Sequence, residues 1–231
     1  MGMRSDSGAP GVTGALGATQ LDMFGAEELG WDERFSTAHR VALDEHSWVE
    51  HVPGWLRGST ELFELLRREG DWEQRERWMI NRRVTEPRLT AEYPRIAGAP
   101  RVLRGIGAAL SRHYGRTYDG LWINLYRDHR DSTSWHADWP SCRRFDCVVP
   151  VLSLGSPRRF LIRPRAGGTS VRFTPAAGDL IVMGGRAQRD WLHMVPKQAR
   201  PAGPRISVNF QSSEQGRSEP ADRLPKVIHD G

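Results

Sequence analysis

Two short motifs of the same kind lie close together in one polar stretch of the chain. His129 and Asp131 form one His-x-Asp pair, and His136 and Asp138 form a second. Side chains two residues apart on an extended backbone point to the same side, so either pair could supply two ligands to one metal ion. A third ligand would come from a distant segment. His193, which follows the apolar segment "GDLIVMGG", is the best candidate.

Two histidines and one carboxylate form the facial triad of non-haem iron sites, which leaves coordination positions open. Imidazole and carboxylate suit Fe(II), and open positions admit a cosubstrate and O₂. A structural zinc site is more often closed by four ligands. The ordinary alternative is a set of hydrogen-bonded surface or core histidines, because the chain contains eight. The polar run around His129 indicates a loop, which favours the pair at His136.

Length and composition are typical of one soluble domain with tails. The chain has 231 residues, 38% hydrophobic and 26% charged, enough for a proper core. It has no run of 18 apolar residues and no secretory signal, so no membrane contact is expected. Cys142 and Cys147 could pair, but two cysteines form no disulfide framework, and a reduced, cytoplasmic setting is favoured.

The net charge of +5 comes almost entirely from arginine, because Lys197 and Lys226 are the only lysines. Both ends of the chain are net acidic, so the basic charge lies on the middle of the sequence. This distribution indicates a phosphate-bearing partner such as nucleic acid. An Arg-rich genome composition is the alternative explanation.

The hydrophobic pattern changes once, from helical spacing to the alternation of strands. Residues 1–30 and 212–231 are expected to be disordered tails around a domain of residues 31–211. Two helices are predicted, over residues 58–72 and 100–115. Six strands are predicted after them, over residues 120–127, 145–155, 158–165, 169–175, 178–185 and 205–211. This order predicts an α+β fold with a double-stranded β-helix (jelly-roll) core and N-terminal helices packed on one side.

Several segments, in order, resemble the AlkB-like family of Fe(II)- and 2-oxoglutarate-dependent dioxygenases, especially its short bacterial branch. Asn124 and Tyr126 match the Asn-x-Tyr of the strand before the metal, and His136-Ala137-Asp138 follows ten residues later. Further matches are the lid element, the segment with the distal histidine and the last core strand, in residues 86–93, 178–197 and 204–211. His129 is too near Asn124 to match. The resemblance therefore assigns the metal to the catalytic ligands His136, Asp138 and His193.

The resemblance implies oxidative dealkylation of N-alkylated nucleic-acid bases, a DNA repair reaction that uses Fe(II), 2-oxoglutarate and O₂. Aldehyde, succinate and CO₂ are the products. The implied cosubstrate contacts lie on two facing strands and are Asn124, Tyr126, Arg205, Ser207 and Gln211. Of these, Arg205 can form a bidentate pair with the carboxylate far from the metal.

The chain departs from the family pattern in two places. Gln211 stands where the family usually has a second arginine, so Gln211→Arg is expected to tighten 2-oxoglutarate binding if Gln211 lines that pocket. Trp139 and Pro140 follow the metal aspartate, where better-known members carry an acidic residue. Recognition of the base edge is therefore expected to differ.

An alkylated base must leave the duplex and be held by stacking. Candidate residues of that pocket are the aromatic side chains Trp78, Tyr93 and Trp135, although most tryptophans lie in protein cores. Candidate phosphate contacts are the basic side chains Arg82, Arg83 and Arg88, although arginine runs are often just solvated faces.

Gln20–Phe24, "QLDMF", resembles the short peptide with which many bacterial DNA-processing proteins bind the sliding clamp. The alternative is that these apolar residues dock onto the protein's own core. A monomer is the default expectation. Two other functions stay open: the same oxygenase chemistry on a modified RNA, protein or small molecule, and a non-catalytic nucleic-acid-binding module.

Overall fold

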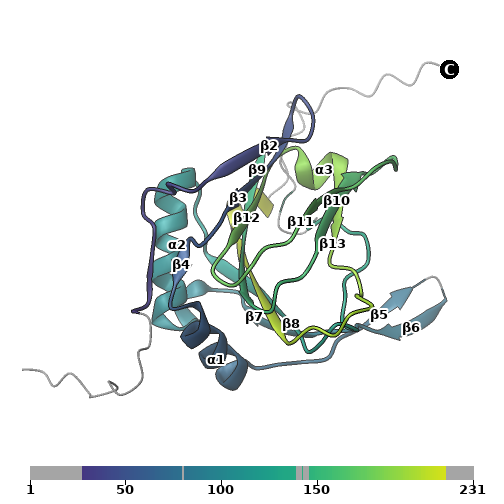
Figure 1. Cartoon of the computed structure of the whole chain (residues 1–231), viewed down its shortest axis with the longest axis horizontal. Helices are drawn as coiled ribbons and strands as arrows, with labels where there is room; N and C mark the ends of the chain where they lie inside the picture. Colours follow the sequence, from purple (N-terminus) through teal and green to yellow (C-terminus); the bar gives the residue numbers. More distant parts are fainter. Residues whose placement is uncertain (1–27, 80, 139–141, 143–145, 217–231) are drawn as a thin grey trace, which may run out of the picture.

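Two antiparallel β-sheets face each other, with two helices on the outer side of the larger sheet (Figure 1). The computed structural model describes residues 28–79, 81–138, 142 and 146–216. The facing sheets form a double-stranded β-helix, or jelly roll, as the sequence predicts. In the described part, no helix is both long and apolar enough to cross a bilayer.

The major sheet has seven strands, and every neighbouring pair is antiparallel. Their order across the sheet is β2 (His39–Ala42), β3 (Ser47–Val52), β12 (Leu180–Gly185), β9 (Cys147–Gly155), β14 (Arg205–Gln211), β8 (Gly120–Tyr126) and β7 (Leu89–Tyr93).

The minor sheet has three strands, in the order β11 (Val171–Phe173), β10 (Phe160–Pro164) and β13 (Trp191–Met194). An isolated antiparallel bridge joins His136 to His193 and adds a fourth segment beside β13. Two further strand pairs lie apart from the jelly roll, namely β1 (Gly30–Trp31) with β4 (Leu56–Arg57) and β5 (Glu76–Met79) with β6 (Arg82–Thr85). The β5–β6 pair is a hairpin that projects from the body (Figure 1).

Strand β9 separates two hydrophobic cores. Val148 and Leu152 belong to the core beneath the helices, whereas Val149 and Val151 belong to the core between the sheets. This division follows from the two-residue period of a strand, and both sides of β9 are apolar because both are covered. The helices over the outer core are α1 (Ser59–Glu69) and α2 (Arg101–Tyr114); shorter ones are η1 (Ile96–Gly98), α3 (Ala187–Asp190) and α4 (Ser213–Gly216).

Both predicted helices and all six predicted strands are present. The predicted order of helices before strands was wrong, because β2 and β3 precede both helices, β7 lies between them, and all three strands extend the major sheet. The signal for β2 is weak, since three of its four residues are exposed. An edge strand needs no continuous apolar run, so its sequence resembles that of a loop.

The folded domain extends past the predicted boundary at residue 211. Helix α4 follows β14 directly, and its Gln215 is buried. Gln215 pairs with both backbone groups of Val148: the Val148 amide donates to Oε1 at 2.6 Å, and Nε2 donates to the Val148 carbonyl at 3.0 Å. These bonds tie the segment to β9. The remaining parts of both predicted tails, with Gln20–Phe24, lie outside the described residues.

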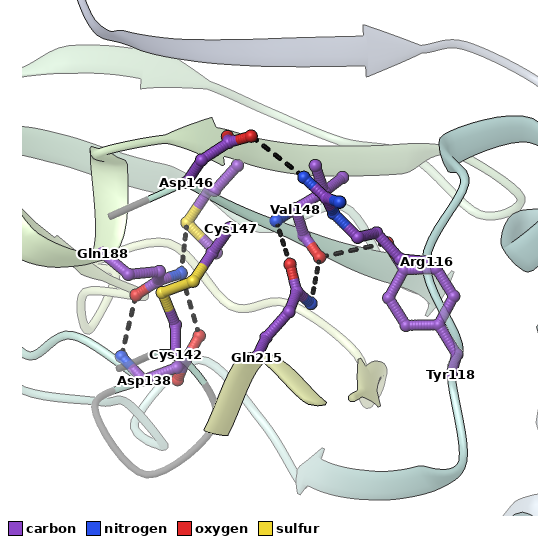
Figure 2. The surroundings of a disulfide bond; sticks show 10 residues. Arg116, Tyr118, Asp138, Cys142, Asp146, Cys147, Val148, Gln188 and Gln215 are labelled. Carbon is purple, nitrogen blue, oxygen red and sulfur yellow. Dashed lines mark hydrogen bonds and ion pairs between the residues drawn. A yellow bond between two sulfur atoms is a disulfide. The ribbon is translucent and has the colours of Figure 1, made fainter. Parts of the chain in front are cut away.

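Cys142 and Cys147 are joined by a disulfide (Figure 2). This differs from the free thiols that the sequence favoured. The Cα atoms lie 6.0 Å apart, within the range that a disulfide spans. The two cysteines are five residues apart in the sequence, and this spacing alone does not tell whether their Cα atoms come close enough to be bridged.

Candidate metal centre and cosubstrate pocket

His136, Asp138 and His193 converge between the two sheets. Their ligand atoms all lie within 4.8 Å of one another. Nε2 of His136 is 3.8 Å from Oδ1 of Asp138, and Nε2 of His193 is 3.5 Å from Oδ2 of the same carboxylate. The other His-x-Asp motif does not belong to this cluster, and the carboxylate of its Asp131 forms an ion pair with Arg127 at 2.8 Å.

Backbone pairing brings the two histidines together. The His136 amide donates to the His193 carbonyl at 3.0 Å, and the His193 amide donates to the His136 carbonyl at 2.8 Å. Nδ1 of His136 lies 2.8 Å from the Ser134 carbonyl oxygen. A proton on Nδ1 would donate to that carbonyl and leave the lone pair of Nε2 free to bind a metal. The long separation in sequence does not loosen the pair, because β13 is itself held in the minor sheet by β10.

Burial keeps His193 neutral. Loss of hydration, reinforced by the nearby His136 ring, lowers the pKa of His193 to about 4, although Asp138 opposes the shift. A metal-binding imidazole must be unprotonated. His193 is therefore in the ligand form at neutral pH.

A cavity of about 450 Å³ adjoins these residues. Its floor is a row of cross-strand pairs on β8 and β14, where alternate residues point to the same side. These pairs are Tyr126 with Arg205, Asn124 with Ser207, Trp122 with Asn209, and Gly120 with Gln211. All five predicted cosubstrate residues thus line one cavity with the three potential ligands.

Arg205 is 2% exposed, and Nη2 donates to Oγ of Ser153 at 2.9 Å. Its Nε and Nη1 are buried and have no hydrogen-bond partner among the residues that the structure describes. Burial lowers the pKa of this guanidinium, while Tyr126 beside it opposes the shift. A buried cation with two unused donors is costly unless an anion completes it. The arrangement fits a carboxylate, which accepts two parallel hydrogen bonds from arginine.

Asn124 is the centre of a hydrogen-bond network in the cavity wall. Its Oδ1 accepts from Nε of Arg88 at 2.9 Å and from Nε1 of Trp122 at 3.0 Å. Its Nδ2 donates to Oγ of Ser207 at 3.4 Å. The amide oxygen is thereby engaged within the protein.

Comparison with known families agrees with this geometry. A sequence profile of the 2OG-Fe(II) oxygenase superfamily matches residues 56–217. The chain belongs to this superfamily. Membership implies Fe(II) as the metal cofactor and 2-oxoglutarate and O₂ as the cosubstrates. The His-Asp-His cluster and the unsatisfied Arg205 fit the first two.

Curated relatives of the chain are AlkB-like. It is 32% identical over 184 residues to alpha-ketoglutarate-dependent dioxygenase alkB homolog 3 of Bos taurus, covering 69% of this chain and 64% of that protein. The Homo sapiens homolog 3 is also 32% identical, over 173 residues, 65% of this chain and 60% of that protein. DNA oxidative demethylase ALKBH2 of Arabidopsis thaliana is 28% identical over 120 residues, 42% and 38% of the two chains. The chain thus covers less than two thirds of the length of these relatives.

Solved structures share the fold at low identity. OsALKBH1 superposes with a TM-score of 0.54 and 13% identity, over 75% of this chain and 100% of that chain. A Trichoplax adhaerens prolyl hydroxylase, solved with a hypoxia inducible factor peptide fragment, gives a TM-score of 0.54 and 14% identity, over 73% and 85%. Both support the jelly-roll fold of the chain.

The structure separates the residues predicted on the β7 segment. Arg88 was expected to contact phosphate, but its side chain is only 12% exposed, pairs with Glu86 at 2.9 Å and lines the cavity. Tyr93 was expected in the base pocket, but it packs against the helix-covered core. The alternation of β7 explains both corrections, because Arg88 and Glu92 share the cavity face and Tyr93 points the other way.

Trp135, Arg82 and Arg83 are not among the described residues that line the cavity. Trp135 is covered by the Arg163 guanidinium, 4.3 Å from its ring centroid. Arg82 and Arg83 are exposed on strand β6 of the hairpin, where Arg83 lies 3.7 Å from Glu76. Trp78 belongs to β5, and its side chain lies outside the description.

The sequence prediction missed several residues of the cavity and the ligand site, and Glu92, Trp122 and Gln188 are the polar or aromatic ones that bear on the site. Glu92 and Trp122 line the cavity; they could have been found by extending the alternation from Arg88 and Asn124. Gln188, hydrogen-bonded to Asp138, has no comparable signal in the sequence.

Proposed function

We propose that this chain is an Fe(II)- and 2-oxoglutarate-dependent dioxygenase that removes N-alkyl groups from nucleic-acid bases in DNA repair. Each turnover would consume one O₂ and one 2-oxoglutarate. One oxygen atom would enter succinate and the other the released aldehyde, with CO₂ as the remaining product. The observation that carries this proposal is the three-residue cluster in the same cavity as a buried arginine with two unused donors.

Each side chain has a definite task. His136 and His193 would hold Fe(II) through Nε2, and Asp138 through its carboxylate. Arg205 would bind the carboxylate of 2-oxoglutarate far from the metal, with Tyr126 and Ser207 beside it. When bound, the iron and cosubstrate supply the oxidising chemistry, and the protein supplies binding and orientation.

Three observations support a nucleic-acid substrate. A relative is named a DNA oxidative demethylase. The chain has a net charge of +5. Arg82 and Arg83 are exposed on the projecting hairpin, where phosphate could approach them. Positive charge of this kind contributes affinity that falls with salt and carries no base specificity.

The test uses metal-free protein prepared with a chelator and reconstituted anaerobically with Fe(II) and 2-oxoglutarate. After O₂ is admitted, succinate and formaldehyde are measured with methylated single- and double-stranded DNA and RNA oligonucleotides. Equal amounts of both products from an oligonucleotide, and neither without Fe(II), support the proposal. Succinate without formaldehyde points to another substrate class. Neither product, with oligonucleotide binding retained, points to a non-catalytic binding module.

The cytoplasmic location, the monomeric state and the clamp contact remain predictions. The clamp contact would be removed by deleting Gln20–Phe24, and capture by immobilised sliding clamp should then be lost. Capture that is identical before and after the deletion would refute it. Because the enzymatic assay does not use the clamp, the two proposals can fail separately.

A further inference from the structure

Gln188 lies beside the potential ligands without belonging to the cluster. It is on α3, five residues before His193, and is 1% exposed. The short helix is braced by an ion pair between Arg186 and Asp190 at 2.6 Å. The position of Gln188 is therefore fixed by the same segment that carries His193 into the minor sheet.

The Gln188 amide holds Asp138 at two points (Figure 2). The backbone amide of Asp138 donates to Oε1 of Gln188 at 2.8 Å. Nε2 of Gln188 donates to Oδ2 of Asp138 at 3.3 Å. A second contact of Nε2, with Sδ of Met183 at 3.4 Å, helps to hold the same orientation.

Both functions of the amide are needed for this contact. The backbone N–H requires an acceptor and the carboxylate requires a donor, and a primary amide presents one of each. The contact restricts rotation of the Asp138 carboxylate about its side-chain bonds. The entropic cost of ordering the Asp138 side chain is then incurred when the protein folds. Metal binding is not weakened by that cost a second time.

We propose that Gln188 is a positioning residue that presents the Asp138 carboxylate to the metal. This inference rests on the proposed function, because it requires the cluster to bind a metal. Gln188 itself contributes no ligand. Its effect is on metal affinity and on the coordination geometry, with any effect on turnover following from these.

Gln215 provides a matched control. It is also buried, and its amide also accepts one hydrogen bond from, and donates one to, a single residue; for Gln215 the partners are the backbone N–H and carbonyl of Val148. Figure 2 shows both glutamines, one on Asp138 and one on Val148. Gln215→Met removes one accepted and one donated hydrogen bond to a single residue, as Gln188→Met does at Asp138, but it leaves Asp138 untouched.

The experiment titrates the metal-free full chain anaerobically with Mn(II) by calorimetry and with Co(II) by absorption spectroscopy. Gln188→Met is expected to weaken binding of both metals about 10- to 100-fold, the usual cost of losing a partner that orients a ligand. It should also change the Co(II) ligand-field bands. Gln215→Met should lower the melting temperature comparably while its metal affinity stays within about twofold of the unmodified chain. Gln188→Asn, which keeps an amide but is one methylene too short, serves as a second variant and should weaken metal binding as well.

Unchanged Mn(II) affinity and Co(II) spectrum in both Gln188 variants would overturn this inference, leaving Gln188 a structural residue like Gln215. That result is distinct from failure of the proposed function. If the unmodified chain binds neither metal, both proposals fall together. If it binds metal but no oligonucleotide is dealkylated, only the nucleic-acid assignment fails.

Discussion

The ligand cluster and the β5–β6 hairpin are built in opposite ways. In the cluster, Nδ1 of His136 faces the Ser134 carbonyl, Asp138 is gripped by Gln188, and His193 is fixed within a sheet. On the hairpin, Arg82 and Arg83 are exposed. Redox chemistry needs ligand atoms held to fractions of an ångström, whereas attraction to phosphate needs only positive charge nearby. Substitutions should therefore cause abrupt losses at the cluster and graded losses on the hairpin.

The largest effect is expected from His193→Ala, which removes a ligand. Metal affinity should fall by more than about 100-fold, because losing even a partner of a ligand costs 10- to 100-fold. Succinate and formaldehyde should become undetectable. His129→Ala, in the other His-x-Asp motif, is the control and should retain both metal binding and turnover. The reverse pattern, with His129 essential and His193 dispensable, would move the metal site.

Arg205→Leu should weaken 2-oxoglutarate binding by about 100-fold, because one partner of a buried charged pair is lost. Arg205→Lys keeps the charge but not the two parallel donors, so its affinity for 2-oxoglutarate should lie between those of the unmodified chain and Arg205→Leu. Binding is measured by anaerobic calorimetry on the Mn(II)-loaded chain. Arg163→Ala is the control, since Arg163 covers Trp135 instead of lining the cavity. Equal losses at both positions would mean that Arg205 has no specific role.

Arg82→Ala combined with Arg83→Ala should weaken oligonucleotide binding only several-fold. The slope of log affinity against log salt should decrease by about one per lost phosphate contact. The matched control replaces Arg101 and Arg104, two exposed arginines on α2, at the far side of the body from the hairpin (Figure 1). Salt slopes that match in the two double variants would exclude the hairpin as a phosphate contact.

The smallest effect is expected from Gln211→Arg. Gln211 lines the cavity but lies six residues from Arg205 along β14, about 20 Å on an extended strand. An arginine there could not grip the carboxylate that Arg205 holds, so its attraction should tighten 2-oxoglutarate binding only about two- to fivefold. The same calorimetric titration measures this change. An unaltered dissociation constant would remove Gln211 from the cosubstrate site.

The sequence by itself determined the features that depend on local periodicity. The two helices and six core strands are read from apolar spacing, and His136 and Asp138 share a side because they are two residues apart. The placement of Asn124 and Tyr126 on the same face as each other follows in the same way. These properties need no knowledge of distant parts of the chain.

Only the tertiary structure decided the features that depend on how distant segments pair. The phase of β7 against β8 directs Arg88 into the cavity and turns Tyr93 toward the helix-covered core. Packing of α3 brings Gln188 onto Asp138, 50 residues away. The packing around Arg205 buries its guanidinium and leaves two of its donors without a partner among the described residues. Each outcome is set by register and desolvation, which are properties of the assembled fold and leave no periodic trace in the sequence.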